Sequence, residues 1–519
     1  METAKKSRNY TQIISWIFFF SVVSTCIILM VIHVKDILNS DMASEMILAK
    51  QLSQSGSILS NQWYYSTELR VINTQLFYAL FFHLTNDWQL VRIFGNILLY
   101  LAFLSSFFFL CKQLKIDRYF PILASILFLP LSEDYTAVIL IGAYYVPRIS
   151  MMFFILGDLV SAGELRKRSV IVYAIFCFLS IAFSFALGLE GARMILVLFM
   201  PIAILVGFEC GIQIHQYRQS HLRESISLRV FLKNSGFLKY FSHAFVICIS
   251  SAIGFGIHQL FLTKRYPFNH FNLLQGFSFS NVKETIADEL VVIGNISQTN
   301  VFSYAIYTCV FILLMIYLFK KFHKSLVSKR FIGLSMTSLV VYTIFSFVFQ
   351  FGQAPRHFLP VAILFLPMIT IVLKELPIKL TTKKFLCVAL CLGFFIVGIP
   401  GYASYMNKHT HEFNIIAPVL EKKQFNYGYA TFWNGNVLTE LTDGKVDVWC
   451  VTGFDNQTLE DPDLFLWLQD KAHDQTIPSG KGFIIWSQEE YDTYHDQEFD
   501  YLGKEIYHSE HYVVYEIEH

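Results

Sequence analysis

Long apolar stretches recur along the first four-fifths of the chain, and short polar segments separate them. A helix needs about 20 mainly apolar residues to cross a bilayer. By that measure the pattern predicts eleven membrane-spanning helices, the third of which is short enough to be a partial insertion instead. The shorter apolar segment Val71–Thr85 predicts a re-entrant or interfacial helix instead. The predicted spans cover residues 13–34, 88–110, 119–132, 144–162, 169–188, 194–214, 240–263, 301–319, 331–350, 357–373 and 385–402.

Composition supports this pattern and narrows the class of protein. Hydrophobic residues make up 54% of the 519 residues, and charged residues only 15%. A soluble protein carries closer to about 25% charged residues. The sequence therefore predicts an α-helical polytopic membrane protein. A net charge of +1, without basic clusters, gives no indication of nucleic-acid binding.

The lysines and arginines between the predicted spans indicate an orientation. The segments expected on the side of the N-terminus hold 23 of them, against 10 on the opposite side. Positive charge is enriched in cytoplasmic segments. We therefore expect a cytoplasmic N-terminus in the plasma membrane, and eleven spans then place the C-terminal region outside the cell.

Two regions follow from the change in composition near residue 405. Residues 1–404 form the predicted transmembrane domain, with a first outer loop at 35–87 and a later outer loop at 264–300. Residues 405–519 contain turn signals and alternating strand and helix patterns, which predict a small extracytoplasmic α/β domain ending in a hairpin. Fold alone does not specify its role, so we expect an accessory or acceptor-positioning module. Its predicted strands are 427–433, 445–451, 482–486, 501–507 and 512–517, and its predicted helices 437–441, 464–470 and 488–495.

The nine cysteines form no recognisable framework. Eight lie in or beside predicted spans, and Cys450 has no partner in the exported domain. Buried cysteines commonly act as small apolar residues. The sequence therefore assigns them no disulfide, zinc site or thiol chemistry.

Two acids, Asp41 and Glu45, follow the first span closely. Their spacing places both carboxylates on one face of a helix. Neighbouring carboxylates either raise the proton affinity of one member or hold a divalent cation such as Mg²⁺ or Mn²⁺. The alternative is that Asp41 only caps the following helix.

Arginines at the outer ends of the predicted spans are candidates for phosphate binding, because their planar guanidinium groups suit bidentate contacts. The alternatives are contact with lipid headgroups or pairing with Glu190, Glu133 and Asp134. Aromatic and polar residues of the outer loops are candidates for substrate contacts, although the aromatics could equally form an interfacial belt, and Glu68 could pair with Arg70. The candidate phosphate ligands are Arg92, Arg148, Arg193 and Arg356, and the candidate substrate contacts are Trp63, Tyr64, Tyr65, Glu68, Arg70, His270 and His357.

The order of these features resembles the GT-C superfamily of membrane glycosyltransferases, which use polyprenyl-phosphate sugars. Protein O-mannosyltransferases and lipid A aminoarabinose transferases are similar. The late run Pro355–Pro360 also resembles the arginine-aromatic entry to a late span in that superfamily. Here Met42 follows the first acid where a second acid is common, which leaves metal dependence open. The matching features of the first loop are Asp41, Glu45, Ala49, Gly56, Trp63, Thr74–Leu84 and Arg92.

The resemblance implies transfer of a sugar from a polyprenyl-phosphate donor, such as an undecaprenyl lipid, to an extracytoplasmic acceptor. The acceptor would be a surface polysaccharide, a teichoic acid or a protein. Asp41 would act as general base in one inverting displacement, and Arg356, with Arg193 or Arg148, would stabilise the leaving phosphate.

Two other functions remain open from the sequence. A transporter or flippase of lipid-linked solutes typically shows internal repeats and ionisable residues near the middle of its spans. A polysaccharide polymerase or ligase typically carries its large loop late in the chain. The sequence shows neither pattern, so we expect the glycosyltransferase.

Overall fold

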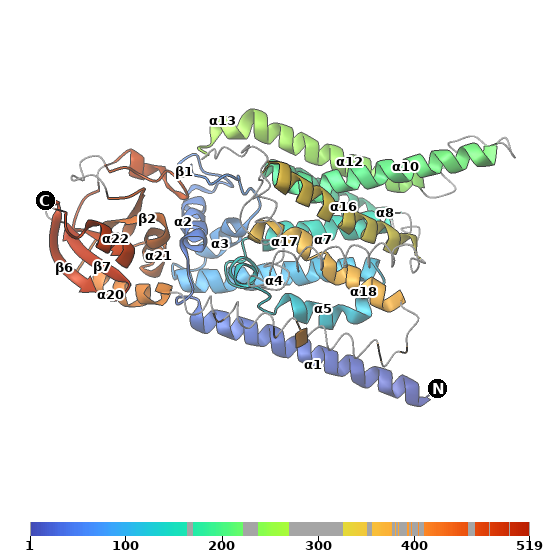
Figure 1. Ribbon diagram of the computed structural model, residues 1–519, viewed down its shortest axis with the longest axis horizontal. Helices are drawn as coiled ribbons and strands as arrows, with labels where there is room; N and C mark the ends of the chain where they lie inside the picture. Colours follow the sequence, from blue (N-terminus) through green and yellow to red (C-terminus); the bar gives the residue numbers. More distant parts are fainter. Residues whose placement is uncertain are drawn as a thin grey trace.

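A bundle of helices carries a small sheet domain at one end, and the N-terminus lies at the other end (Figure 1). This computed structural model describes residues 2–162, 170–221, 237–268, 325–349, 355–375, 409–454, 462–476, 478–497 and 499–517, with a few single residues between 379 and 403. The prediction of a mostly helical membrane domain with a small C-terminal sheet domain is confirmed.

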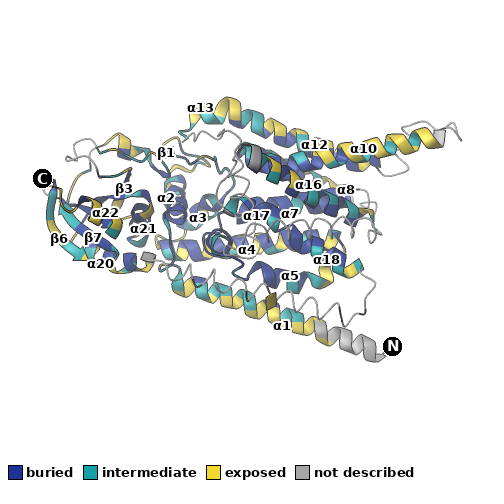
Figure 2. Cartoon of the chain, in the orientation of Figure 1, coloured by how far each residue is buried: buried dark blue, intermediate teal, exposed yellow. Residues whose placement is uncertain are grey.

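Six helical segments of the described residues are long and apolar enough to cross a membrane. Large apolar side chains such as Ile13, Ile14 and Ile17 of α1 (Glu2–His33) remain exposed, as expected for a surface that contacts lipid. Figure 2 shows the same exposure along the outer faces of α1, α10 (Met200–His221) and α12 (Phe237–Ile257). The six segments are Gln12–His33, Trp88–Gln113, Val170–Leu189, Ala192–Gln219, Phe237–Arg265 and Arg356–Glu375.

The remaining predicted spans have different outcomes. The segment predicted at 119–132 forms the eight-residue helix α5 (Phe120–Leu127), which is too short to cross the membrane and agrees with the alternative of a partial insertion. The span at 331–350 corresponds to α16 (Leu326–Phe349). Residues 301–319 and nearly all of 385–402 lie outside the described residues, so the total of eleven stays a prediction.

The span predicted at 144–162 forms one helix, and a sharp bend precedes it. The helical stretch Glu133–Ile141, formed by α6 (Glu133–Tyr135) and η2 (Thr136–Ile141), meets α7 (Val146–Ser161) at 84°. Segments of π-helix, which often occur at functional sites, form η2, η4 (Ile195–Phe199) and η5 (His258–Leu262). The break at residues 142–145 contains Tyr144 and Tyr145 and directly precedes α7.

The first outer loop is largely helical. It contains α2 (Ser40–Ser55), the short strand β1 (Trp63–Tyr64) and α3 (Thr74–Phe82). Asn39 caps α2, because its side chain accepts a hydrogen bond from the Met42 N–H at 3.0 Å. Gly56 ends the helix at φ +64°, a conformation that glycine adopts without steric cost. The α3 helix of nine residues agrees with the short helix predicted at Val71–Thr85.

The C-terminal domain contains a five-stranded mixed sheet with strand order β3-β2-β5-β7-β6. Its strands are β2 (Tyr427–Thr431), β3 (Asp447–Val451), β5 (Gly482–Ser487), β6 (Leu502–His508) and β7 (Tyr512–Ile517). The β2 strand runs parallel to β3 and β5, and β6 and β7 form the predicted antiparallel hairpin.

The helices of this domain follow the predictions only in part. Two predicted helices form as α21 (Phe432–Leu441) and α22 (Gln488–Tyr494), while α20 (Phe413–Lys422) was not predicted. The helix predicted at 464–470 is wrong, because Gln469–Asp470 form strand β4, which pairs with β1 of the first loop.

Two glycines allow α8 (Val170–Leu189) and α12 (Phe237–Ile257) to pack closely. A Cβ atom at Gly188 would lie 2.2 Å from the Ser251 carbonyl oxygen, and one at Gly254 would lie 2.3 Å from the Phe185 carbonyl oxygen. Small residues permit such approach between membrane helices.

We expect Gly254→Ala to destabilise the protein by about 1–3 kcal/mol, because the added methyl group overlaps a backbone oxygen. The matched control is Gly256→Ala on the same helix, where a Cβ atom would meet nothing within 4 Å. Thermal unfolding in detergent would measure both changes. Equal melting temperatures for the two variants would contradict this account of the interface.

Candidate functional site

Asp41 lies in the first turn of α2, close to Arg356, which is more than 300 residues further along the sequence. Asn39 caps the helix, so the Asp41 carboxylate is not used as a cap. The carboxylate oxygen Oδ2 lies 4.0 Å from Nη2 of Arg356, which belongs to the short helix η6 (Pro355–Phe358). The Asp41 residue is buried, whereas the Arg356 side chain is 33% exposed. A carboxylate and a partly open guanidinium group therefore face each other here.

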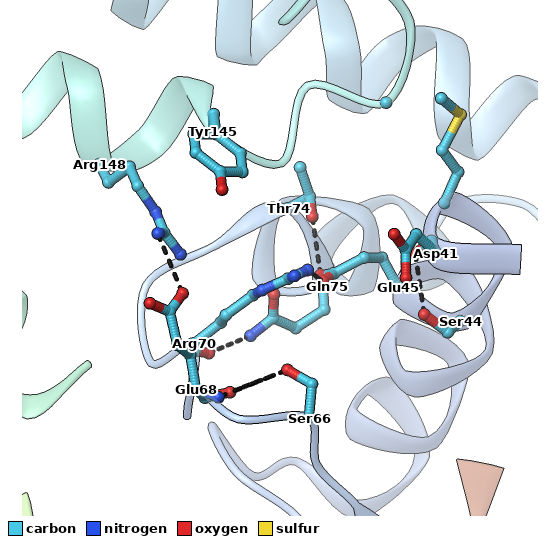
Figure 3. A network of polar contacts seen from close by, with 12 residues as sticks. Asp41, Ser44, Glu45, Ser66, Glu68, Arg70, Thr74, Gln75, Tyr145 and Arg148 are labelled. Atoms are coloured by element: carbon cyan, nitrogen blue, oxygen red, sulfur yellow. Dashed lines mark hydrogen bonds and ion pairs between the residues drawn. The ribbon is translucent and has the colours of Figure 1, made fainter. Parts of the chain in front are cut away.

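Glu45 lies one turn beyond Asp41, and its two oxygens have separate partners. Arg70 Nη1 forms an ion pair with Oε1, and the Thr74 hydroxyl donates to Oε2 at 2.8 Å. The guanidinium of Arg70 also lies over the Tyr144 ring, 5.0 Å from its centroid. Figure 3 shows this group from close by. Glu45 therefore connects α2 to α3 and to the loop before it.

Glu68 holds two further arginines together. Its oxygens lie 3.1 Å from Nη1 of Arg148 and 2.8 Å from Nε of Arg193. Burial alone would raise the pKa of Glu68, but Arg193 and Arg148 outweigh this effect and lower it to about 2. Glu68 is therefore ionised at neutral pH and balances part of the charge of these two arginines.

Glu190 completes the network between α8 and α9 (Ala192–Met194). Its Oε2 lies 3.8 Å from Nε of Arg148. Burial raises the pKa of Glu190 to about 7, against the opposing effect of Arg148. Gly191 follows at φ +120° and ψ −160°, a region that is essentially restricted to glycine. This turn allows Glu190 and Arg193 to reach the same network from successive helices.

Two tyrosines at the bend before α7 line the network, although the sequence analysis did not select them. The Tyr145 hydroxyl accepts a hydrogen bond from Nη1 of Arg193 at 2.5 Å, and its ring lies under Arg148 at 4.8 Å. Tyr144 and Tyr145 stand just ahead of Val146, Pro147 and Arg148 at the predicted end of a span, and this position was a signal that could have identified them.

Four acids and four arginines thus gather at the end of the bundle that faces the sheet domain. With Glu190 ionised the network has no net charge, and with Glu190 protonated it has a charge of +1. The acids balance the charges of the arginines, so burial of the network is tolerated. A network that is neutral or carries one positive charge would also be suited to an anionic phosphate. The members are Asp41, Glu45, Glu68, Glu190, Arg70, Arg148, Arg193 and Arg356.

Several sequence-predicted contacts are placed differently. The suggested Glu68–Arg70 pair is wrong, since Glu68 pairs with Arg148 and Arg193, and Arg70 with Glu45. His357 follows Arg356, is within electrostatic reach of Glu68, and stays a candidate contact. His270 and nearly all of the later loop, from residue 269 to 300, lie outside the described residues.

The three aromatic residues predicted to stack on sugars belong to the packing of the first loop. Trp63 is fully buried and Tyr65 is 3% exposed, so their ring faces are covered. The Tyr65 ring packs against Tyr266 and Phe268. Tyr64 is half-buried, and its hydroxyl donates to Asp474 of the C-terminal domain at 2.8 Å. Burial and the hydrogen bond to Asp474 raise the pKa of Tyr64 to about 12.

A divalent cation at Asp41 and Glu45 does not fit the described contacts. Both oxygens of Glu45 are engaged by Arg70 and Thr74, and Asp41 faces a guanidinium group. Within the described part of the chain, no third His, Cys, Asp or Glu joins these two acids in a group with metal-ligand spacing. We derive no step through a metal at this position.

Arg92, another predicted phosphate ligand, contacts the C-terminal domain instead. Its Nε and Nη2 lie 2.7 and 2.6 Å from the two carboxylate oxygens of Glu440 on α21. Nη2 also donates to the Met42 carbonyl oxygen at 3.0 Å. Burial raises the pKa of Glu440, and Arg92 opposes that effect. The bidentate pair therefore joins α4 (Trp88–Gln113), α2 and the sheet domain.

Other contacts fix the sheet domain to the first loop. The β1–β4 pairing aligns Trp63 with Asp470, whose carboxylate also accepts a hydrogen bond from Gln51 at 3.1 Å. The Trp88 N–H donates to Asp443 at 3.0 Å. The C-terminal domain therefore helps to hold α2 and the first outer loop in place.

Comparison with known proteins was made on both sequence and structure. No family model matches the chain, and no curated protein sequence matches it. Two crystal structures of ArnT from Cupriavidus metallidurans, one bound to undecaprenyl phosphate and one in the apo state, match 96% of this chain and 97% of theirs. Their TM-scores are 0.53 and 0.52, each at 11% sequence identity.

The chain has the GT-C fold. The predicted resemblance is therefore confirmed at the level of the fold, in an alignment that spans nearly the full length of both chains. An oligosaccharyltransferase from Archaeoglobus fulgidus, solved in complex with Zn and sulfate, is more distant, at 10% identity and a TM-score of 0.41. It matches 82% of this chain and 62% of its own.

We expect Glu440→Ala to destabilise this GT-C fold by about 3–5 kcal/mol, because it leaves the Arg92 charge buried without its partner. The control is Glu421→Ala, which removes the exposed partner of Lys445 in the same domain and should leave stability unchanged. Thermal unfolding and limited proteolysis of the purified protein would compare them. Identical protease resistance in both variants would contradict the role of Arg92 as the link between the domains.

Proposed function

We propose that this protein is a membrane glycosyltransferase that moves a sugar from a polyprenyl-phosphate donor to an acceptor outside the cytoplasm. The observation that carries the proposal is the Asp41 carboxylate, which faces the Arg356 guanidinium at 4.0 Å within a GT-C fold. The acceptor is a cell-surface polysaccharide, a teichoic acid or a protein. The donor class is supported by the likeness to a fold in which ArnT was crystallised with undecaprenyl phosphate.

In this mechanism Asp41 acts as the general base. Its carboxylate takes the proton of the acceptor hydroxyl while that oxygen attacks the anomeric carbon of the sugar. The bond between the anomeric carbon and the phosphate oxygen breaks, and its electron pair leaves with the phosphate. The acceptor attacks from the side opposite the leaving group, so the configuration at the anomeric carbon inverts.

Charge is balanced in this step, and it moves from one group to another. The carboxylate becomes neutral as the phosphodiester with one negative charge becomes a phosphate monoester with two. Arg356 is placed to stabilise that second charge, since its side chain is the most exposed of the four arginines in the network.

Arg148 and Arg193 have a supporting position in this proposal. Both are bound to Glu68 and both are buried, so contact with a phosphate would compete with an existing ion pair. They add positive potential and hold the loop that carries Glu68 and Arg70. The direct phosphate contact is assigned to Arg356.

The proposed base is tested by Asp41→Asn, which keeps the shape of the side chain and removes its ability to accept the proton. We expect kcat to fall about 10²–10⁴-fold, the usual contribution of a general base. The assay follows transfer from a panel of undecaprenyl-phosphate sugars by the protein purified in detergent. Asp492→Asn, on an exposed helix of the C-terminal domain, is the matched control.

An unchanged rate in folded Asp41→Asn protein would exclude Asp41 as the base. Failure of the wild-type protein to transfer any sugar of the panel, while it moves the intact lipid across vesicles, would instead indicate a flippase.

The phosphate contact is tested by Arg356→Lys, which keeps the charge and loses the planar fork. We expect a fall in kcat/KM of about 10-fold or more, since one charge-assisted contact contributes about 1.5–3 kcal/mol. Arg265→Lys, at an exposed position beside Tyr266, controls for the general effect of the exchange. Equal kcat/KM values for the two variants would contradict the assignment.

A further inference from the structure

Three side chains with metal-ligand chemistry meet inside the helical bundle, away from the network around Asp41. Asp158 lies on α7, Cys177 on α8 and His243 on α12. One potential ligand atom from each lies within 4.8 Å of the other two. Asp158 is fully buried, His243 is 7% exposed and Cys177 is half-buried. Residues far apart in sequence thus form a compact cluster of carboxylate, imidazole and thiol.

The contacts within this cluster leave the carboxylate incompletely satisfied. The Ser180 hydroxyl donates to Asp158 Oδ2 at 2.7 Å, and Nε2 of His243 lies 2.9 Å from the same oxygen. That approach does not have the geometry of a hydrogen bond, and Asp158 Oδ1 accepts none from any described residue. A buried carboxylate oxygen without a partner is unfavourable, and a bound cation would compensate for it.

The donor set fits a borderline-soft divalent cation. Thiolate, imidazole and carboxylate are the side chains that bind Zn²⁺, commonly in tetrahedral geometry. Sγ of Cys177 lies 3.7 Å from Nδ1 of His243. Standard Zn–S and Zn–N bond lengths give a tetrahedral edge of about 3.6 Å between such atoms. Asp158 approaches the other ring nitrogen of His243, Nε2, at 2.9 Å. A single ion uses only one nitrogen of an imidazole, so an ion bound through Nδ1 and the Cys177 sulfur would require the Asp158 carboxylate to turn away from Nε2.

Charge and the surrounding shell also favour this cation. A thiolate and a carboxylate together neutralise Zn²⁺, which suits the low dielectric of a membrane interior. The Ser180 hydroxyl orients the carboxylate, as groups outside the first set of ligands typically do at metal sites. Binding would release the proton of Cys177, because the thiolate is the form that binds metal.

We propose that Asp158, Cys177 and His243 form a Zn²⁺ site that joins α7, α8 and α12. The site is separate from the glycosyl-transfer site. On α7, Asp158 lies ten residues beyond Arg148, which corresponds to about 15 Å along the helix axis. On α8, Cys177 lies 13 residues before Glu190, which follows the end of the helix, and this corresponds to about 20 Å along the helix axis. The ion therefore acts as a structural link below the outer network.

The local sequence around the cysteines gives no indication of a zinc site. The three ligands are separated by 19 and 66 residues and lie on different predicted spans. Sequence signatures of zinc sites depend on short ligand spacings. The mutual packing of α7, α8 and α12 brings these residues together, and Gly188 and Gly254 permit the close approach of α8 to α12.

The test uses the full-length protein in detergent, treated with a chelator and then titrated with Co²⁺. Thiolate coordination gives a sulfur-to-cobalt charge-transfer band in the near ultraviolet. We expect the band to saturate at one Co²⁺ per chain and to disappear on addition of Zn²⁺. Cys177→Ser should abolish it. The control Cys248→Ser should retain it, because Cys248 lies on α12 with its sulfur 3.6 Å from the Phe199 carbonyl oxygen, outside the cluster.

A second measurement needs no variant. Zn²⁺ should slow the alkylation of Cys177 by a maleimide in the wild-type protein by at least about tenfold, because metal-bound thiolate is not free to react. Mass spectrometry of the alkylated peptides would report Cys177 and Cys248 separately, and Cys248 should show no protection. Absence of both the band and the protection would overturn the proposal and leave an ordinary Asp158–His243 ion pair. A band that persists in Cys177→Ser would also overturn it.

Discussion

The ion pairs between the first outer loop and the ends of the spanning helices are the interaction on which the rest of the site depends. Two acids of the loop pair with arginines: Glu45 meets Arg70 of the same loop, and Glu68 meets Arg148 and Arg193 of the spanning helices. A buried charge without a partner is strongly destabilising. The loop is therefore bound to one arrangement, and Asp41 on α2 takes its position relative to Arg356 from it.

The same constraint extends to the C-terminal domain. Glu440 binds Arg92, and Arg92 donates to the carbonyl of Met42, which is the residue after Asp41. Strand β4 pairs with β1, so the domain also holds the other end of the loop. The sheet domain thereby restricts the movement of α2. In the proposed reaction the domain therefore helps to position Asp41. Arg92 contacts Glu440 and Met42, so we assign it to this role and not to phosphate binding.

Breaks in the helices make this arrangement possible. The 84° bend before α7 presents Tyr145 and Arg148, and the turn at Gly191 presents Glu190 and Arg193. Uninterrupted helices would direct these side chains around the bundle, since successive residues are spaced by 100°. Interruptions at the end of the bundle concentrate them in one place instead. The proposed metal site, by contrast, needs no break in a helix, because its three residues meet where α7, α8 and α12 pack together.

Hydropathy determined the membrane domain, most of the individually described spans and the strands of the C-terminal domain, because burial in lipid or in a sheet imposes a pattern on neighbouring residues. The order of the predicted spans also puts Asp41, Glu45 and Arg356 on the same side of the membrane. The partners of Glu68 and Arg92 were decided only by the tertiary structure, and so were the covered faces of Trp63 and Tyr65. Pairing and burial of this kind depend on residues tens to hundreds of positions away. No local pattern in the sequence records such distances.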